Sequence, residues 1–160
     1  MKKMVLVFCV CAALVVSCVR VNPPVEDAGA SFNWGKQLMN EGKIALAIVE
    51  FKKAVAFFDE AGYTYSAFGV YPYIARGYYL SGKTDEAIGT YFEALGYAKE
   101  HGDAVGGNDR ADVMRELAGL LKEVNRIGEA RSLLTDAADL YMKSGNEKAF
   151  KEVVQQLDEL

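Results

Sequence analysis

The residues best suited to nucleophilic or metal chemistry are three cysteines and one histidine. Cys9, Cys11 and Cys18 lie near the start of the chain, whereas His101 stands alone far from them. A metal site needs several ligands together, and a nucleophile needs a base beside it. The run Gly106 to Asp109 follows no strand pattern and lacks the Lys-Ser/Thr of a phosphate-binding loop. We therefore predict no catalytic site, no metal site and no cofactor, with His101 at a helix end where a cation suits the helix dipole.

The surroundings of Cys18 indicate a different chemistry, which is acylation of its thiol. Lys2 and Lys3 precede an apolar run from Val5 to Val16. That run is too short to cross a bilayer as a helix, which takes about 20 apolar residues. A basic start and a short apolar run are typical of a signal peptide. The run ends in Val15-Val16-Ser17-Cys18, which resembles the lipobox of bacterial lipoproteins, although Val15 stands where that box more often has Leu.

The lipobox resemblance implies that Cys18 receives a diacylglyceryl group and that cleavage removes residues 1–17 as a lipoprotein signal peptide. Cys9 and Cys11 would leave with the signal, so no thiol would remain for a disulfide. Val19 occupies the position where Asp, in such lipoproteins, resembles an inner-membrane retention signal. Val19 therefore favours the outer membrane, facing the periplasm, or the outer face of the membrane in a cell that has only one. The alternative is an ordinary cleaved signal with an incidental cysteine.

Charge and composition narrow the partners of the rest of the chain. Without residues 1–17 the remaining 143 residues carry 16 basic and 22 acidic side chains, a net charge of −6. Nucleic acid and anionic lipid both call for a basic surface, so we predict neither as a charge-driven partner. Membrane attachment would come from the acyl chains. Residues 18–30, with Pro23, Pro24 and Gly29, are predicted to form a lipidated N-terminus and stiff tether, within which helix could begin near Glu26.

From Ser31 onward apolar residues recur at the i, i+3, i+4, i+7 spacing of amphipathic helices. Gly42, Gly82, the run Asn125 to Gly128, and Gly145 interrupt this pattern and suit helix ends. Three motifs then repeat, each with two small residues around a large one. They are Ala47-x-x-x-Phe51-x-x-Ala54, Ala87-x-x-x-Tyr91-x-x-Ala94 and Ala130-x-x-x-Leu134-x-x-Ala137.

This repeat resembles the tetratricopeptide repeat (TPR) over about residues 28–143. The resemblance implies an all-α fold for residues 31–160: a short right-handed α-solenoid of about three helix hairpins, with a capping helix at about residues 147–159. The period is 40 and then 43 residues, against about 34 in the family. We expect the extra residues in loops at Gly62–Phe68 and Gly102–Asn108. The family's Trp and terminal Pro are missing, and an unrelated all-α bundle is the alternative.

The TPR resemblance implies a protein or peptide partner, here in the cell envelope, held in a groove lined by the first helix of each hairpin. Arg76 and Tyr79 are expected to lead partner binding, and such a basic–aromatic pair suits acidic or aromatic side chains. Chaperone tails are not predicted, because Asp112 and Glu116 replace the family's basic clamp residues. Three units are few for tight binding, which leaves homodimerisation open. The residues expected on the groove are Phe32, Lys36, Asn40, Arg76, Tyr79, Arg115 and Lys122.

Tyrosines suggest a second function, that of a small-ligand carrier or transporter accessory. Eight of the nine tyrosines lie between Tyr63 and Tyr97. Because the residue before a proline disfavours helix, Pro72 predicts a second-unit helix that starts near Phe68 to Pro72 with an aromatic loop before it. That loop could form a pocket, or it could simply pack on the core. The candidate ligand-binding residues are Tyr63, Tyr65, Tyr71 and Tyr73.

Overall fold

The computed structural model describes residues 24–160. The predicted signal peptide, Cys18 and the first part of the tether lie outside the described residues. Within residues 24–160 there are seven α-helices and one 3₁₀ turn, and 87% of the residues are helical. The helices are α1 (Pro24–Asn40), α2 (Ile44–Glu60), α3 (Thr64–Leu80), α4 (Thr84–His101), α5 (Gly107–Glu123), α6 (Ile127–Ser144) and α7 (Glu147–Asp158), with the 3₁₀ turn at Gly102–Ala104.

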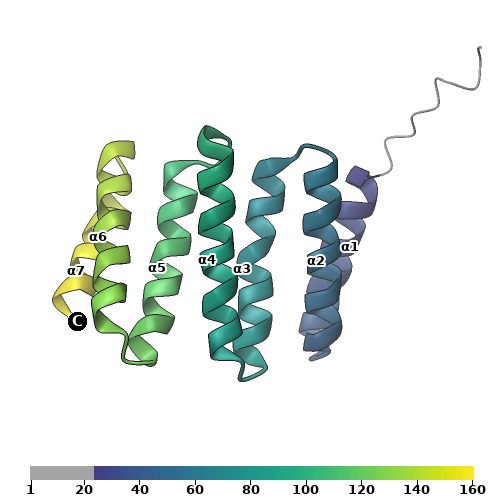
Figure 1. Ribbon diagram of the computed structural model, residues 1–160, viewed down its shortest axis with the longest axis horizontal. Helices are drawn as coiled ribbons and strands as arrows, with labels where there is room; N and C mark the ends of the chain where they lie inside the picture. Colours follow the sequence, from purple (N-terminus) through teal and green to yellow (C-terminus); the bar gives the residue numbers. More distant parts are fainter. Residues whose placement is uncertain (1–23) are drawn as a thin grey trace, which may run out of the picture.

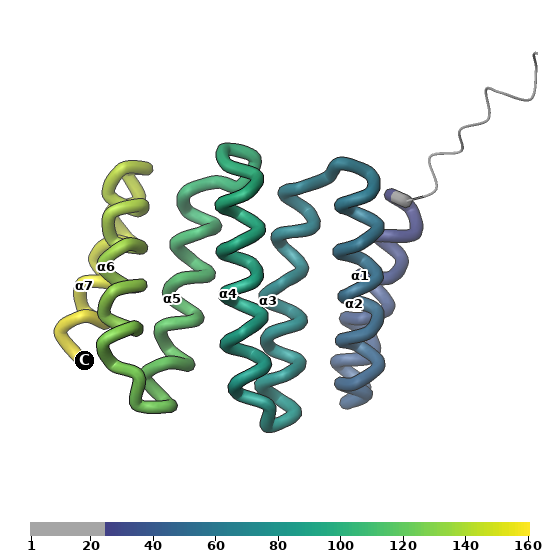
Figure 2. Tube along the Cα trace, in the orientation of Figure 1, coloured from purple at the N-terminus to yellow at the C-terminus, as the bar shows by residue number. Residues whose placement is uncertain are grey.

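The helices stand side by side in a row of antiparallel hairpins, from α1 and α2 at one end to α7 at the other (Figures 1 and 2). Each helix packs on the next one along the chain. The predicted short all-α solenoid of three hairpins is therefore confirmed. The shorter α7 lies against α6 and closes the row where a capping helix was predicted. None of the described helices is both long and apolar enough to cross a membrane.

Tight turns end the helices at the predicted breaks. After α3, Gly82 adopts φ +73°, and the Lys83 amide donates to the Tyr78 carbonyl at 3.0 Å. This is the Schellman arrangement, which needs a left-handed residue. After α5 the same conformation falls on Asn125, with φ +60°, because Asn tolerates that region better than most residues with side chains.

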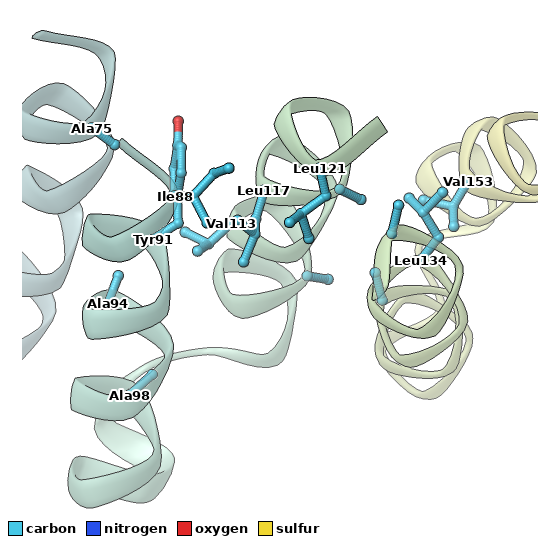
Figure 3. Packing of buried hydrophobic residues seen from close by; sticks show 14 of the residues in the cluster. Ala75, Ile88, Tyr91, Ala94, Ala98, Val113, Leu117, Leu121, Leu134 and Val153 are labelled. Carbon is cyan, nitrogen blue, oxygen red and sulfur yellow. The ribbon is translucent and has the colours of Figure 1, made fainter. Parts of the chain in front are cut away.

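The three small–large–small motifs pack as predicted. Ala47, Ala87 and Ala130 are fully buried, and Tyr91 and Leu134 extend into the core between helices (Figure 3). Two glycines mark the closest approaches. A Cβ on Gly35 would lie 2.7 Å from the Phe51 ring, and one on Gly77 would lie 2.6 Å from Ile48 Cγ1.

Replacing Ala87 by leucine should destabilise the fold far more than replacing Ala61 by leucine. Ala87 is completely buried, and overpacking a tight core costs about 1–3 kcal/mol. Ala61 is half-buried and follows the last residue of α2, where a longer side chain can turn toward solvent. Thermal unfolding followed by circular dichroism compares the two variants. Equal melting temperatures would show that Ala87 does not lie at a tight crossing.

The predicted start of the second unit is wrong. Helix α3 begins at Thr64, and Pro72 lies inside it. Proline has no N–H, so only the bond to the Phe68 carbonyl is lost, and buried residues on both sides, such as Phe68 and Ile74, hold the helix in place. The Gly62–Phe68 loop is therefore absent, and the longer period is absorbed by helices of 17 or 18 residues.

The start of α5 and the start of α1 differ less from the predicted boundaries. A connection outside the α-helices does follow α4, and it contains the 3₁₀ turn. It ends at Gly106, because α5 begins at Gly107 rather than after Asn108. Helix α1 begins at Pro24, two residues before Glu26. Proline suits the first turn of a helix, where its missing N–H costs nothing. Residues 24–30, which we expected in the tether, thus form the start of α1.

Candidate partner-binding groove

A groove crosses the face formed by the first helices of the three hairpins. It consists of two adjoining hollows of about 390 and 460 Å³, called here the first and second hollow. Both are lined by Pro72, Tyr73 and Glu116, so they form one continuous groove between α3 and α5. Phe32 of α1 and Phe58 of α2 extend its lining at one end. The second hollow also includes Ala75, Arg76, Tyr79, Tyr91 and Leu120.

Small residues of α3 create the first hollow. Gly69 lines it, and a Cβ added there would meet no atom within 4 Å. Pro72 lies three residues further along the same helix and offers only a compact ring. Because Pro72 has no N–H, the Phe68 carbonyl lacks its usual i+4 donor. At Gly69 and Pro72, α3 therefore presents no long side chain to the first hollow, and space remains there.

Carboxylates dominate the opposite wall, on α5. Asp109, Asp112 and Glu116 all line the first hollow, and Glu116 lines the second as well. Their spacing of three and four residues places them on one face of the helix, and Glu123 continues that spacing further along. Three acidic side chains thus converge on the first hollow.

Tyrosine hydroxyls hold these carboxylates from neighbouring helices. Tyr65 of α3 donates to Asp109 Oδ1 at 3.1 Å, and Tyr91 of α4 donates to Glu116 Oε2 at 2.8 Å. Burial and the bond to Glu116 raise the pKa of Tyr91, so its hydroxyl stays protonated and keeps donating. Two further bonds of this kind are Tyr79 to Glu123 Oε2 at 3.0 Å and Tyr141 to Asp112 Oδ1 at 2.5 Å.

Three of the five predicted groove residues of the first two hairpins line the hollows, and two do not. Arg76 and Tyr79 both line the second hollow. Phe32 lines the first hollow and meets the Tyr73 ring edge-on, with centroids 5.0 Å apart. Lys36 is exposed, with its Nζ 5.4 Å from the centre of the Phe32 ring. Asn40, the last residue of α1, is exposed and lines neither hollow.

Arg115 and Lys122 do not join this group. They line a separate, smaller hollow with residues of α7. Arg115 Nη1 donates to Glu152 at 2.8 Å, and Lys122 Nζ donates to the Glu159 carbonyl at 3.2 Å. One residue along a helix turns the side chain by about 100°, so Arg115 faces α7 while its neighbour Glu116 lines the groove with α3. Both cations therefore tie the capping helix to α5.

The candidate ligand-binding tyrosines are dispersed. Tyr65 and Tyr73 line the first hollow. Tyr71 instead packs on Tyr97, with ring centroids 5.6 Å apart, and Tyr63 is exposed in the turn before α3. The four rings thus form no common pocket.

His101 ends α4, as predicted. Its ring stacks on Tyr97 at a centroid distance of 4.1 Å, and its Nδ1 lies 2.9 Å from the Tyr97 carbonyl. These contacts lie within its own helix and give the ring a structural role. In the part of the chain that the structure describes, no three potential ligands are grouped as a metal ion would require.

Two features of this groove were not predicted from the sequence. Gly69 was not among the predicted binding residues, because its role depends on the empty space beside it. Asp112 and Glu116 were interpreted only as evidence against chaperone tails, and Asp109 was not a predicted binding residue. The signal was present in the regular spacing of the three acidic residues along α5.

Comparisons with known proteins agree on the fold. No protein-family model matches the sequence. No curated protein matches it. Among solved structures, a kinesin light chain-type protein from Podosopora anserina with nearly identical TPR-like repeats aligns with a TM-score of 0.55 and 16% identity, covering 82% of this chain and 74% of that one. BtubC from P. vanneervenii aligns with a TM-score of 0.53 and 18% identity, and the alignment covers 82% of this chain and 62% of the BtubC chain. The chain therefore has a TPR-like fold.

Proposed function

We propose that this chain is a protein–protein interaction module, a scaffold or adaptor that binds an extended segment of a partner in the groove between α3 and α5. The continuous groove carries this proposal, because its two hollows share Pro72, Tyr73 and Glu116 and lie end to end. Each hollow has room for one or two side chains, and the lining is mostly apolar. Successive side chains of an extended segment would occupy successive hollows.

A small-ligand carrier receives less support from the same geometry. Ligand pockets usually enclose most of the molecule they bind. Here the hollows are open along the surface, and only Tyr65 and Tyr73 of the four candidate tyrosines line them. A groove of this form suits a polymer better than an isolated small molecule.

We further propose that the module acts in a bacterial cell envelope, held to the membrane by acyl chains on Cys18. The lipobox-like sequence Val15 to Cys18 supports this part of the proposal. Two or more acyl chains give stable anchoring. Attachment near the start of the chain would keep the groove close to the membrane surface while leaving it open to partners.

Filling the first hollow should abolish partner binding without harming the fold. Gly69→Trp places a large side chain where an added Cβ meets nothing, and loss of a helical glycine favours the helix. The full chain, purified in mild non-ionic detergent, serves as bait for solubilised envelope, and captured proteins are quantified by mass spectrometry. We expect a partner recovered by the unmodified chain to fall at least tenfold with Gly69→Trp.

Gly89→Trp provides the matched control. Gly89 lies on α4, is exposed, has equally free space around it and lines neither hollow. This variant should capture the partner at an unchanged level. Partners retained in full by Gly69→Trp, with helicity equal in both variants, would rule out the groove as the binding site.

A further inference from the structure

The two hollows differ in charge. The first hollow contains Asp109, Asp112 and Glu116 and no basic side chain. In the second, Arg76 is the one cation in the lining and Glu116 the one carboxylate. Lys36, another predicted groove residue, is exposed and does not line the first hollow. The first hollow is therefore a concentration of negative charge above an apolar floor.

The hydrogen bonds around this hollow leave its charge largely uncompensated. A tyrosine hydroxyl is neutral, so donation from Tyr65 to Asp109 and from Tyr91 to Glu116 positions each carboxylate without cancelling its charge. Each carboxylate can accept more than one hydrogen bond. Of the three carboxylates, only Asp112 forms an ion pair within 4 Å, at 3.5 Å from Arg115 Nη2. Arg115 is also bound to Glu152 at the shorter distance of 2.8 Å.

The floor and walls of the first hollow suit a long cationic side chain. Phe32, Phe58 and Val113 offer apolar surface for an aliphatic stem. The carboxylates offer acceptors for its charged end, and hydrogen bonds between charged groups are about twice as strong as neutral ones. Tyr73 also lines the hollow, and an aromatic ring attracts a cation that lies over its face. The carboxylates and the aromatic ring thus all attract a positively charged group.

We propose that the groove selects an extended protein segment that places a lysine or arginine side chain in the first hollow. This inference rests on the proposed function and specifies the partner's chemistry. It reverses the expectation from sequence, in which Arg76 and Tyr79 favoured an acidic or aromatic partner. The arrangement of Asp109, Asp112 and Glu116 around the first hollow outweighs the single Arg76, which lines only the second hollow.

Three fluorescein-labelled 12-residue peptides provide the test, built as repeats of Lys-Gly-Leu, Glu-Gly-Leu and Ser-Gly-Leu. Binding to the full chain is measured by fluorescence anisotropy at about 0.15 M salt, where distant surface charges are screened. We expect the lysine peptide to bind at least tenfold more tightly than the serine peptide, and the glutamate peptide to bind most weakly.

Neutralising the acidic wall should remove this preference. The triple variant Asp109→Asn, Asp112→Asn and Glu116→Gln keeps an oxygen acceptor for each tyrosine hydroxyl but removes three charges. It should lower lysine-peptide affinity at least tenfold and leave the serine peptide unchanged. Ser66→Lys supplies an independent arm, because Ser66 lines the first hollow and a tethered ammonium there should compete with the peptide's own.

A second triple variant separates the groove from general attraction to an acidic protein. Glu93→Gln, Asp136→Asn and Asp139→Asn remove the same charge from exposed sites outside the groove, and they should change lysine-peptide affinity less than twofold. Equal losses in both triple variants, or no preference for the lysine peptide, would overturn the inference. If all peptides bound alike and Gly69→Trp abolished their binding, the groove would stand and only its preference for cations would fail. Binding that Gly69→Trp left intact would reject both.

Discussion

Replacing Phe51 by alanine should lower the free energy of unfolding by about 3–5 kcal/mol, the range measured for buried aromatic truncations. Phe51 is completely buried. Its ring centroid lies 5.8 Å from that of Phe32 and 5.4 Å from that of Tyr73, so one side chain joins α1, α2 and α3. Gly35 adds a third constraint, because its missing side chain lets α1 approach the Phe51 ring. Chemical denaturation followed by circular dichroism measures the loss.

Phe92→Ala is the matched control, with the same atoms removed from a side chain that is 41% exposed. It should cost less than about 1 kcal/mol, in line with most substitutions away from the core. Phe51→Ala should also weaken the binding of a partner in the groove, because Phe32 and Tyr73 line the first hollow and both rings pack against Phe51. Similar losses of stability in the two variants would show that the small–large–small motif does not centre on Phe51.

The repeat architecture was predictable because its determinants are local in sequence. A small–large–small motif specifies where two helices cross, and a glycine after a helical run specifies where the chain reverses. Spacing alone was enough to assign three residues to a helix crossing: Ala87, Tyr91 and Ala94. All three are buried in the structure. The turn at Gly82 needed only its residue type. Such features depend on neighbours three or four residues away, which the sequence displays directly.

The start of α3 was not predictable from those local rules. Pro72 argued for a helix boundary, yet the helix passes through it. Its cost is one missing hydrogen bond and some steric strain. Packing of Phe68 and Val70 on one side and of Ile74 on the other offsets that cost. The stabilisation that this packing provides cannot be recognised from the residues next to the proline in the sequence.

The groove face of α5 was missed for a different reason. The periodicity of apolar residues identifies the buried side of a helix. It does not tell which neighbouring helix each residue on the polar side will face, because that depends on how the helices stack. Arg115 and Glu116 are adjacent, yet Arg115 contacts α7 and Glu116 lines the groove with α3. The capping helix decides this division by engaging Arg115 and Lys122. The groove, for which basic residues were expected from the sequence, is for that reason acidic in its first hollow.

Cys18→Ala should abolish fatty-acid incorporation and with it the attachment of this chain to the membrane. A thioether to the diacylglyceryl group requires the Cys18 sulfur, and alanine offers no nucleophile. None of the described helices is long and apolar enough to cross a membrane. Expression of the full chain in a bacterium fed an alkyne fatty acid, followed by coupling of a fluorophore, measures incorporation directly.

Cys11→Ala supplies the matched control, since it removes the same thiol from within the predicted signal peptide. That variant should be labelled like the unmodified chain, because its residue would be cleaved away and never acylated. The helical domain should be equally helical in all three forms, because none of the cysteines lies in residues 24–160. Label that persisted in Cys18→Ala, or that disappeared in Cys11→Ala, would place acylation elsewhere. The proposed membrane attachment through Cys18 would then fail, while the groove and its acidic wall would be unaffected.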